Sequence, residues 1–221
     1  MSQPEENAMQ RVGVLGSGEV GQTLAAGFKS HGYEVKIASR APAKLAEFSR
    51  TSGIPAGTLA DVAAWGEMLV LAVHGGAALD ALGVAGAASL AGKIVIDATN
   101  PIDDEAPVDG VLRVFTGPNE SLHERLQAAF PKARFVKAFN SVGSARMVNP
   151  ALAGGRPTMF LCGNDESAKS TVSALLQQFG WEPADMGTAV AARAIEPLAV
   201  LWCIPGFRQD SWTHAFKVIW S

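Results

Sequence analysis

Apolar and polar positions alternate along the chain with two different periods. Short apolar runs have the length of strands, and stretches with apolar residues at helical spacing separate them. The run 68–73 is continuously apolar, as expected for a parallel strand buried on both faces. This alternation predicts an α/β fold with a Rossmann-type, doubly wound, mostly parallel sheet. The strands of its first part are expected at 12–15, 34–38, 68–73, 93–97 and 134–138, with a short edge strand at 54–58.

The pattern continues after residue 140 with further strands and helices. Strands are expected at 157–162 and 181–186, and helices at 166–179 and 190–201. We divide the chain into a flexible N-terminal tail at 1–10, a Rossmann domain at 11–155, and a small C-terminal α/β part at 156–221.

Three glycines follow the first predicted strand at the spacing G-x-G-x-x-G. Gly16 permits the tight turn out of the strand, Gly18 lets the backbone approach a pyrophosphate, and Gly21 lets the helix pack closely. The helix that follows offers free N–H groups and its positive dipole end to the phosphates. The setting between a strand and a helix predicts a dinucleotide site. A glycine-rich turn in another α/β fold is the alternative.

The end of the second predicted strand indicates which dinucleotide binds. An NAD site places an acidic residue about 20 positions beyond the glycines, where it binds the ribose 2′-hydroxyl. This chain has Ser39 and Arg40 there, with Lys44 one turn into the next helix, and its first acid is Glu47. A guanidinium binds a 2′-phosphate through charge-assisted hydrogen bonds. The sequence therefore favours NADP over NAD, although Arg40 as a solvated surface residue is the alternative.

Composition narrows the class of protein further. The chain has 221 residues, of which 48% are hydrophobic and 18% charged, so it can bury a sizeable core. Its net charge of −3 gives no reason to expect a nucleic acid or an acidic membrane surface as a partner. The polar first ten residues predict no signal peptide, and no apolar run is expected to be long enough to cross a bilayer. Two cysteines far apart, Cys162 and Cys203, suit a reducing cytoplasm.

Few residues are candidates for acid–base chemistry. His74 follows the strand 68–73, at the edge of the sheet where ligands of open α/β sheets bind. A role as a hydrogen-bond partner of a ribose or phosphate is favoured over acid–base work. His123 is expected to be solvated on an amphipathic helix at 121–130, and Lys137 to be exposed at a sheet edge. The acidic loop that begins at Asp103 is expected to be solvated and not a metal site.

Three tryptophans lie near the C-terminus, at Trp202, Trp212 and Trp220. Burial in the core is the favoured interpretation, because large aromatic side chains mostly serve burial. A stacking surface for a flat ring and a contact between two copies are the alternatives. The apolar, tryptophan-rich segment makes a homodimer plausible.

Several segments, taken in order, resemble one family. They look like the NADPH-dependent coenzyme F420 (deazaflavin) oxidoreductases, and the fold is similar to the NADPH-binding domain of the STEAP metalloreductases. The segments Asp-Ala-Thr-Asn-Pro and Lys-Ala-Phe-Asn are more specific than the glycine motif. The resemblance covers residues 11–201, and its segments are 16–21, 38–40, 73–74, 97–101, 137–140, 162–165, 191–193 and 196–198.

The resemblance implies an NADP-binding domain with a C-terminal part that closes over the nicotinamide. It implies that Ser17, Glu19 and Val20 cover the pyrophosphate with their backbone, and that Ser39, Arg40 and Lys44 hold the 2′-phosphate. It further implies that Val73 and His74 flank a ribose, and that Ala138 and Asn140 lie beside the nicotinamide with Asn100 nearby. His74 and Asn140 are the candidates for catalytic positioning.

The resemblance further implies a cytoplasmic NADPH-dependent oxidoreductase that passes hydride to or from coenzyme F420, FMN or FAD. The cofactors carry such chemistry, so no protein nucleophile is needed. The tail at 206–217 departs from the family pattern, which leaves the acceptor open. The alternatives are a reductase of a small carbonyl or imine substrate and a non-catalytic NADPH-binding sensor.

Overall fold

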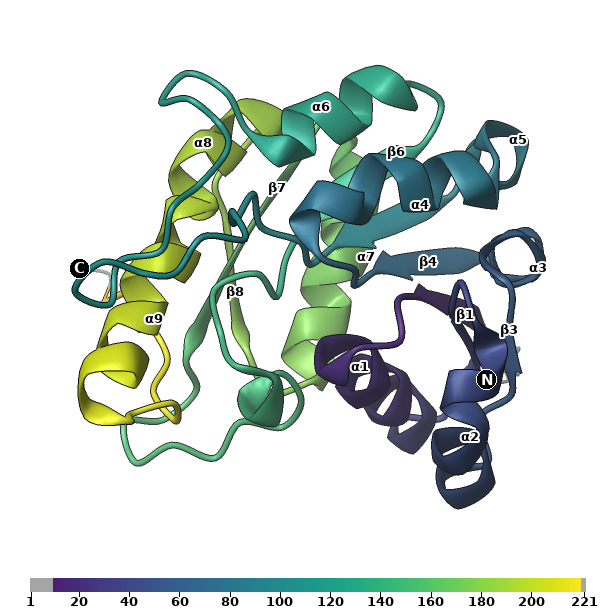
Figure 1. The fold of residues 1–221 in the computed structure, drawn as a ribbon, viewed down its shortest axis with the longest axis horizontal. Helices are drawn as coiled ribbons and strands as arrows, with labels where there is room; N and C mark the ends of the chain where they lie inside the picture. The colour runs from purple at the N-terminus through teal and green to yellow at the C-terminus, as the bar shows by residue number, and fades with distance from the viewer. Residues whose placement is uncertain (1–9, 220–221) are drawn as a thin grey trace, which may run out of the picture.

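The computed structural model describes residues 10–219 (Figure 1). Nearly all of the predicted N-terminal tail, and Trp220, lie outside the described residues. The described chain forms an α/β structure with helices on both faces of one sheet.

The sheet has eight strands in the order β3-β2-β1-β4-β5-β6-β7-β8. All neighbouring pairs run parallel except β6 and β7, which are antiparallel. The predicted Rossmann-type, mostly parallel fold is therefore confirmed. The strands are β1 Arg11–Leu15, β2 Glu34–Ala38, β3 Ala56–Gly57, β4 Met68–Leu71, β5 Ile94–Asp97, β6 Arg134–Lys137, β7 Thr158–Gly163 and β8 Glu182–Asp185.

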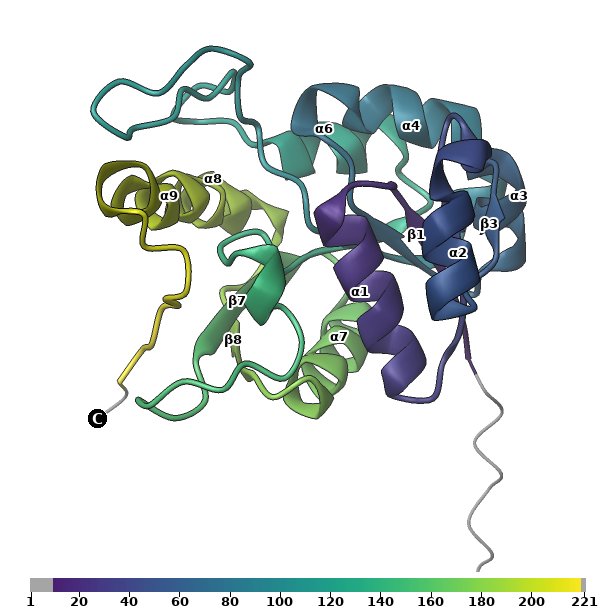
Figure 2. The same cartoon turned by 60° about the horizontal axis from the view of Figure 1, so that its bottom comes forward.

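Two layers of helices enclose this sheet. Figure 2 shows α1 and α7 on one face and α4 and α6 on the other. The α-helices are α1 Glu19–Ser30, α2 Ala46–Ser52, α3 Leu59–Trp65, α4 Ala78–Ala85, α5 Ala87–Leu90, α6 Leu122–Ala129, α7 Glu166–Gln178, α8 Ala192–Ile195 and α9 Pro197–Gln209. Short 3₁₀ turns lie at η1 Pro42–Leu45, η2 Gly75–Ala77, η3 Ser144–Arg146 and η4 Ala189–Ala191.

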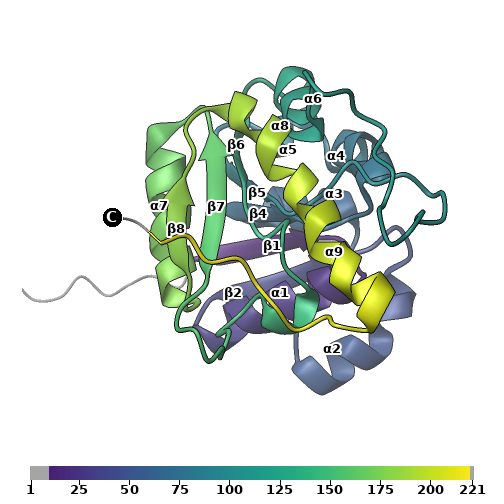
Figure 3. The same ribbon diagram turned by 90° about the vertical axis from the view of Figure 1, so that its left-hand side faces the viewer.

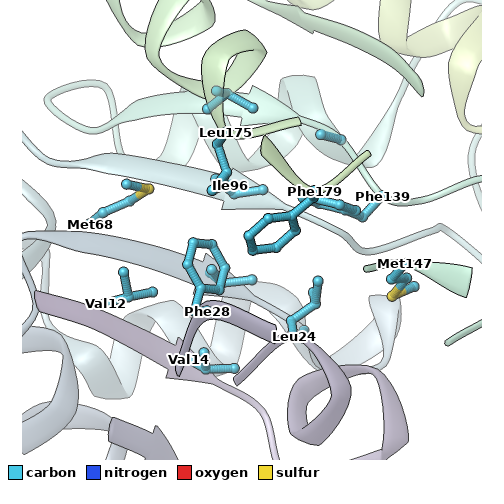
Figure 4. Close-up of a cluster of buried hydrophobic side chains, with 14 of the residues drawn as sticks. Val12, Val14, Leu24, Phe28, Met68, Ile96, Phe139, Met147, Leu175 and Phe179 are labelled. Atoms are coloured by element: carbon cyan, nitrogen blue, oxygen red, sulfur yellow. The ribbon is translucent and has the colours of Figure 1, made fainter. Parts of the chain in front are cut away.

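A cluster of aromatic rings joins the N-terminal and C-terminal parts of the chain within one core (Figure 4). Phe179, which follows α7, packs 5.0 Å from Phe28 of α1 and 6.1 Å from Phe139 after β6, measured between ring centroids. All three side chains are fully buried. Side chains from both sides of the predicted boundary at 155/156 therefore share one hydrophobic cluster. The boundary itself stays a prediction.

The helical segment 189–209 is longer than the pattern predicted. It has 21 residues and a mean hydropathy of 1.4, so it is long and apolar enough to cross a membrane by length and composition. The expectation that no apolar segment reaches such a length was wrong, because the helix continues through Pro205 to Gln209. Packed helices of water-soluble proteins can have the same length and composition. Here α9 buries Ala199, Trp202 and Gly206.

Two irregular segments lie beside α9. The irregular segment after β5 is closed by bridges between Ile102 and Val114 and between Val108 and Val111. Beyond α9, the tail crosses β7 (Figure 3). The backbone N–H of Thr158 donates to the carbonyl of Phe216 at 2.8 Å. Both segments contact α9: Gly110 lies against Ile204 and Phe207, and the Trp202 indole N–H donates to the carbonyl of His214 at 2.8 Å.

Candidate functional site

The glycine loop joins β1 to α1, and its three glycines meet different surroundings. Gly16 has a φ of +139°, and a Cβ there would overlap the carbonyl of Ala72. A Cβ on Gly21 would overlap the carbonyl oxygen of Gly16, whereas one on Gly18 would meet nothing within 4 Å. Gly16 and Gly21 are therefore required by packing. Gly18 faces open space at the start of α1, where no side chain caps the helix.

A cavity of about 320 Å³ opens beside this loop. Its volume falls in the range of small-molecule sites. It brings together segments that are distant in the sequence: the glycine loop, the end of β2, η1, the end of β4 and α4. The predicted residues that line it are Gly16, Ser17, Gly18, Ser39, Arg40, Lys44, Val73 and His74.

The polar groups of the cavity are arranged mainly at one end. Arg40 and Lys44 are exposed, and neither forms a salt bridge with any residue that the structure describes. The Ser39 hydroxyl accepts a hydrogen bond from the Ala41 N–H at 3.1 Å. Asp80 of α4 is the single carboxylate in the lining. The end formed by β2 and η1 therefore presents two cationic side chains and a hydroxyl to an incoming ligand.

The remaining predicted residues lie outside the lining of this cavity. Glu19, Val20 and Gly21 begin α1 but do not line the cavity, and neither do Asn100, Ala138 and Asn140. The Glu19 carboxylate accepts a hydrogen bond from the Ser144 hydroxyl at 2.6 Å, which ties the start of α1 to the loop after β6.

Asn100 and Asn140 form a reciprocal pair at the ends of β5 and β6. The Asn100 amide donates to the Asn140 carbonyl at 2.8 Å, and the Asn140 amide donates to Asn100 Oδ1 and to the Ile195 carbonyl, each at 3.0 Å. Asn140 Oδ1 is buried and has no hydrogen-bond partner among the described residues. The pair therefore links the two strand ends to α8.

Behind this pair lies a buried network of charged side chains. Lys137 Nζ lies 2.9 Å from Asp97 Oδ2 and 2.9 Å from Glu196 Oε1, and it donates to the Thr99 carbonyl at 2.7 Å. His123 Nδ1 lies 2.9 Å from Asp97 Oδ2. Glu196 is 2% exposed and the other three charged or titratable residues are fully buried.

Two predictions about this network were wrong. Lys137 was expected at a sheet edge, but the antiparallel strand β7 pairs with β6 and makes it an interior strand. His123 was expected to be solvated, but the first turn of α6 packs inward and buries its ring completely. Asp97 and Glu196 stood in segments that resemble the family, but neither was assigned a role. The sequence did contain a signal for one pair. Asp97 and Lys137 carry opposite charges at the ends of two apolar runs, and in the parallel strands β5 and β6 they stand directly opposite each other.

The network holds Lys137 and Asp97 in their charged forms. Burial disfavours the Lys137 ammonium, but the Asp97 and Glu196 carboxylates outweigh it and raise the pKa of Lys137. Burial likewise disfavours the Asp97 carboxylate, but Lys137 and the His123 hydrogen bond bring the pKa of Asp97 well below its usual value. A carboxyl whose pKa is lowered by folding stabilises the fold when the pH is above its pKa in the unfolded chain, which is about 4. This stabilisation is lost as the pH falls further.

The other candidate sites in the described chain offer less support for a function. A second cavity of about 290 Å³ lies between Pro101 and the residues Arg193, Glu196 and Pro197, and none of the predicted site residues lines it. Among residues 10–219, no three His, Cys, Asp or Glu side chains are grouped so that they could hold a metal ion. Burial raises the pKa of the Cys162 thiol to about 12, so this cysteine is not a nucleophile at neutral pH.

Comparisons with known proteins give a consistent result. Residues 11–101 match the family model described as NADP oxidoreductase, coenzyme F420-dependent. A solved structure from Arthrobacter sp. FB24, described as a putative F420-dependent NADP reductase, is 34% identical with a TM-score of 0.89, over 94% of this chain and 98% of that one. A hypothetical protein from Sinorhizobium meliloti is 29% identical with a TM-score of 0.73, over 86% and 91% of the two chains.

A curated relative is much longer than this chain. Metalloreductase STEAP3 of Rattus norvegicus is 32% identical over 205 residues, which are 88% of this chain and 38% of the relative. The chain therefore spans well under half of that protein.

The geometry of the glycine loop predicts opposite effects for two similar substitutions. Gly21→Ala should destabilise the fold by about 1–3 kcal/mol, because its Cβ overlaps backbone. Gly18→Ala should leave the melting temperature nearly unchanged but weaken NADPH binding by about tenfold, because its methyl group occupies the space open to a phosphate. Thermal unfolding and fluorescence titration measure the two effects. Equal NADPH affinity in Gly18→Ala and the wild type would contradict the assignment of the loop.

Proposed function

The chain belongs to the family of coenzyme F420-dependent NADP oxidoreductases, and from this premise we propose that it transfers hydride between NADP(H) and a deazaflavin or flavin-like acceptor. The observation that carries the proposal is the cavity beside Gly18 with Ser39, Arg40 and Lys44 at one end. The enzyme is an NADP-dependent oxidoreductase. Coenzyme F420, FMN and FAD are the proposed acceptors.

The adenosine half of the cofactor fits the cavity. We assign the pyrophosphate to the backbone of Ser17, Glu19 and Val20, where the start of α1 supplies a positive dipole end. Arg40 and Lys44 lack carboxylate partners within the described chain and are free to bind the 2′-phosphate. The cavity's carboxylate, Asp80, comes from α4 and not from the β2 end that holds these cations.

The nicotinamide half is assigned to the ends of β4, β5 and β6. Val73 and His74 would flank a ribose, and Asn100, Ala138 and Asn140 would lie beside the ring. NADPH supplies the hydride chemistry when it is bound. The contribution of the chain is to orient the ring with rigid strand ends and to exclude water with α9 and the tail.

His74 is proposed as a positioning residue. Its side chain is half exposed, and its Nε2 lies 3.5 Å from the exposed carboxylate of Asp104. An exposed histidine at the cavity rim is suited to a hydrogen bond with a ribose. Reduction of a small carbonyl or imine would instead require a proton donor here.

The longer metalloreductase relative adds little to the choice of acceptor. Metal reduction is stated in its name, but this chain corresponds to 38% of it. We therefore assign no metal substrate to this chain.

A homodimer is proposed through the exposed face of α9. Leu201 and Phe207 are about half exposed on this helix, as is Val190 in the turn that precedes it. Exposed large apolar side chains commonly mark an interface. The cytoplasm remains the proposed location.

Removal of Arg40 tests the cofactor assignment. Arg40→Ala should weaken NADPH binding by about 1–3 kcal/mol and change NADH binding little, because only NADPH carries the 2′-phosphate. Arg50→Ala is the control, since Arg50 lies on α2 and pairs with Glu47 outside the cavity. Equal losses of affinity for NADPH and NADH would mean that the 2′-phosphate binds elsewhere.

Turnover tests the acceptor. Purified protein mixed with NADPH should oxidise it when coenzyme F420, FMN or FAD is present, as followed by absorbance of the dihydronicotinamide. Oxidation only with small carbonyl or imine compounds, lost in His74→Ala at unchanged NADPH affinity, would favour the reductase alternative. Tight NADPH binding with no oxidation under any condition would indicate a sensor.

Sedimentation tests the dimer. The wild type should sediment as a dimer and Leu201→Glu as a monomer, because a charge would be buried in the interface. Leu79→Glu is a matched control on α4, where Leu79 is 39% exposed. A wild-type monomer at micromolar concentration would refute the interface.

A further inference from the structure

The buried network around Lys137 carries more negative than positive charge. Its two carboxylates, Asp97 and Glu196, face a single ammonium. Apart from His123, the remaining partners are neutral groups of the backbone and of Thr99, whose hydroxyl donates to Asp97 at 2.6 Å. The net charge of the network therefore depends on the charge of His123.

The surroundings of His123 favour its neutral form. Nδ1 is hydrogen-bonded to Asp97, which accepts a proton donor, whereas Nε2 is buried and has no partner within the described residues. An imidazolium would bury an unsatisfied N–H donor that carries part of a charge, which is strongly unfavourable. With His123 neutral, the side chains of the network sum to a charge of −1.

The helix dipole of α6 offsets only part of this charge. The Glu196 carboxylate accepts hydrogen bonds from the backbone N–H groups of Leu122 and His123, each at 2.9 Å. The start of a helix carries at most about half a positive charge. Part of the negative charge therefore remains, on side chains that are almost completely buried.

This charge is connected through the backbone and hydrogen bonds to the residues assigned to the nicotinamide. Lys137 precedes Ala138 in the chain, and its ammonium is bonded to the carbonyl of Thr99, the residue before Asn100. Glu196 follows Ile195, whose carbonyl accepts from Asn140. Every residue assigned to the ring is thus joined to the network by a covalent neighbour or a hydrogen bond.

We propose that Glu196 sets the redox-state preference of the cofactor site, so that the protein binds NADP⁺ more tightly than a charge-balanced site would. When the C4–H bond of NADPH breaks, the hydride and its two electrons pass to the deazaflavin or flavin acceptor, and the ring becomes a cation. The buried negative charge stabilises that cation relative to the neutral dihydronicotinamide. Hydride flow from NADPH to the acceptor is favoured. The inference rests on the proposed function for the position of the ring.

The test compares the two redox states of one cofactor. In Glu196→Gln, which keeps the shape and removes the charge, the ratio Kd(NADP⁺)/Kd(NADPH) should rise about fivefold over the wild type. This change corresponds to a shift of about 20 mV in the bound couple, since tenfold is about 30 mV for two electrons. Glu124→Gln is the control, because it removes a charge from the nearby exposed pair with Arg193.

Asp97→Asn provides a second variant if Glu196→Gln does not fold, and it should shift the ratio in the same direction. If Glu196 had only a structural role, the substitution would weaken the binding of NADP⁺ and NADPH equally and leave the ratio of their Kd values unchanged. A ratio within twofold of the wild type in a folded variant that binds both nucleotides would overturn the proposal. Failure of the wild type to bind either nucleotide would instead refute the proposed function.

Discussion

The contact of Lys137 with two buried carboxylates is the constraint on which the C-terminal half of the structure depends. A buried ammonium is tolerated only when its charge is paired and its hydrogen bonds are made. Asp97 supplies the pair from the neighbouring strand, and Glu196 supplies a second from the junction of α8 and α9. Loss of one partner of such a pair typically costs about 3–5 kcal/mol. The network thereby fixes where α9 crosses the sheet, and with it the wall of the proposed nicotinamide site.

The other end of the cleft follows a different rule. Around Gly18 and Arg40 the backbone is accessible and the cations lack protein partners in the described chain, so a ligand can complete their interactions. The inner end is held in place by the Asn100–Asn140 pair and by the network. A site that is open where phosphates bind and rigid where a ring is oriented suits hydride transfer, since the chemistry requires alignment more than it requires a protein acid or base.

The aromatic core explains how two distant parts of the chain serve one site. Phe179 follows α7 and packs on Phe28 of α1, so the C-terminal strands extend the sheet that holds the glycine loop. The antiparallel pairing of β7 with β6 then buries Lys137, and the tail ties α9 back to β7 through Thr158. Each of these contacts joins residues far apart in the sequence.

The sequence by itself determined the features that depend on near neighbours. The alternating periods specified the parallel strands, and the spacing of Gly16, Gly18 and Gly21 marked the turn, because steric limits on a strand–turn–helix are local. Ser39, Arg40 and Lys44 were likewise found by their place after β2, and the structure gathers them in one cavity. Only the tertiary structure decided the environment of Lys137 and His123 and the link from Glu196 to the sheet. Burial of a charge depends on partners that arrive from other elements, and no local period contains that information.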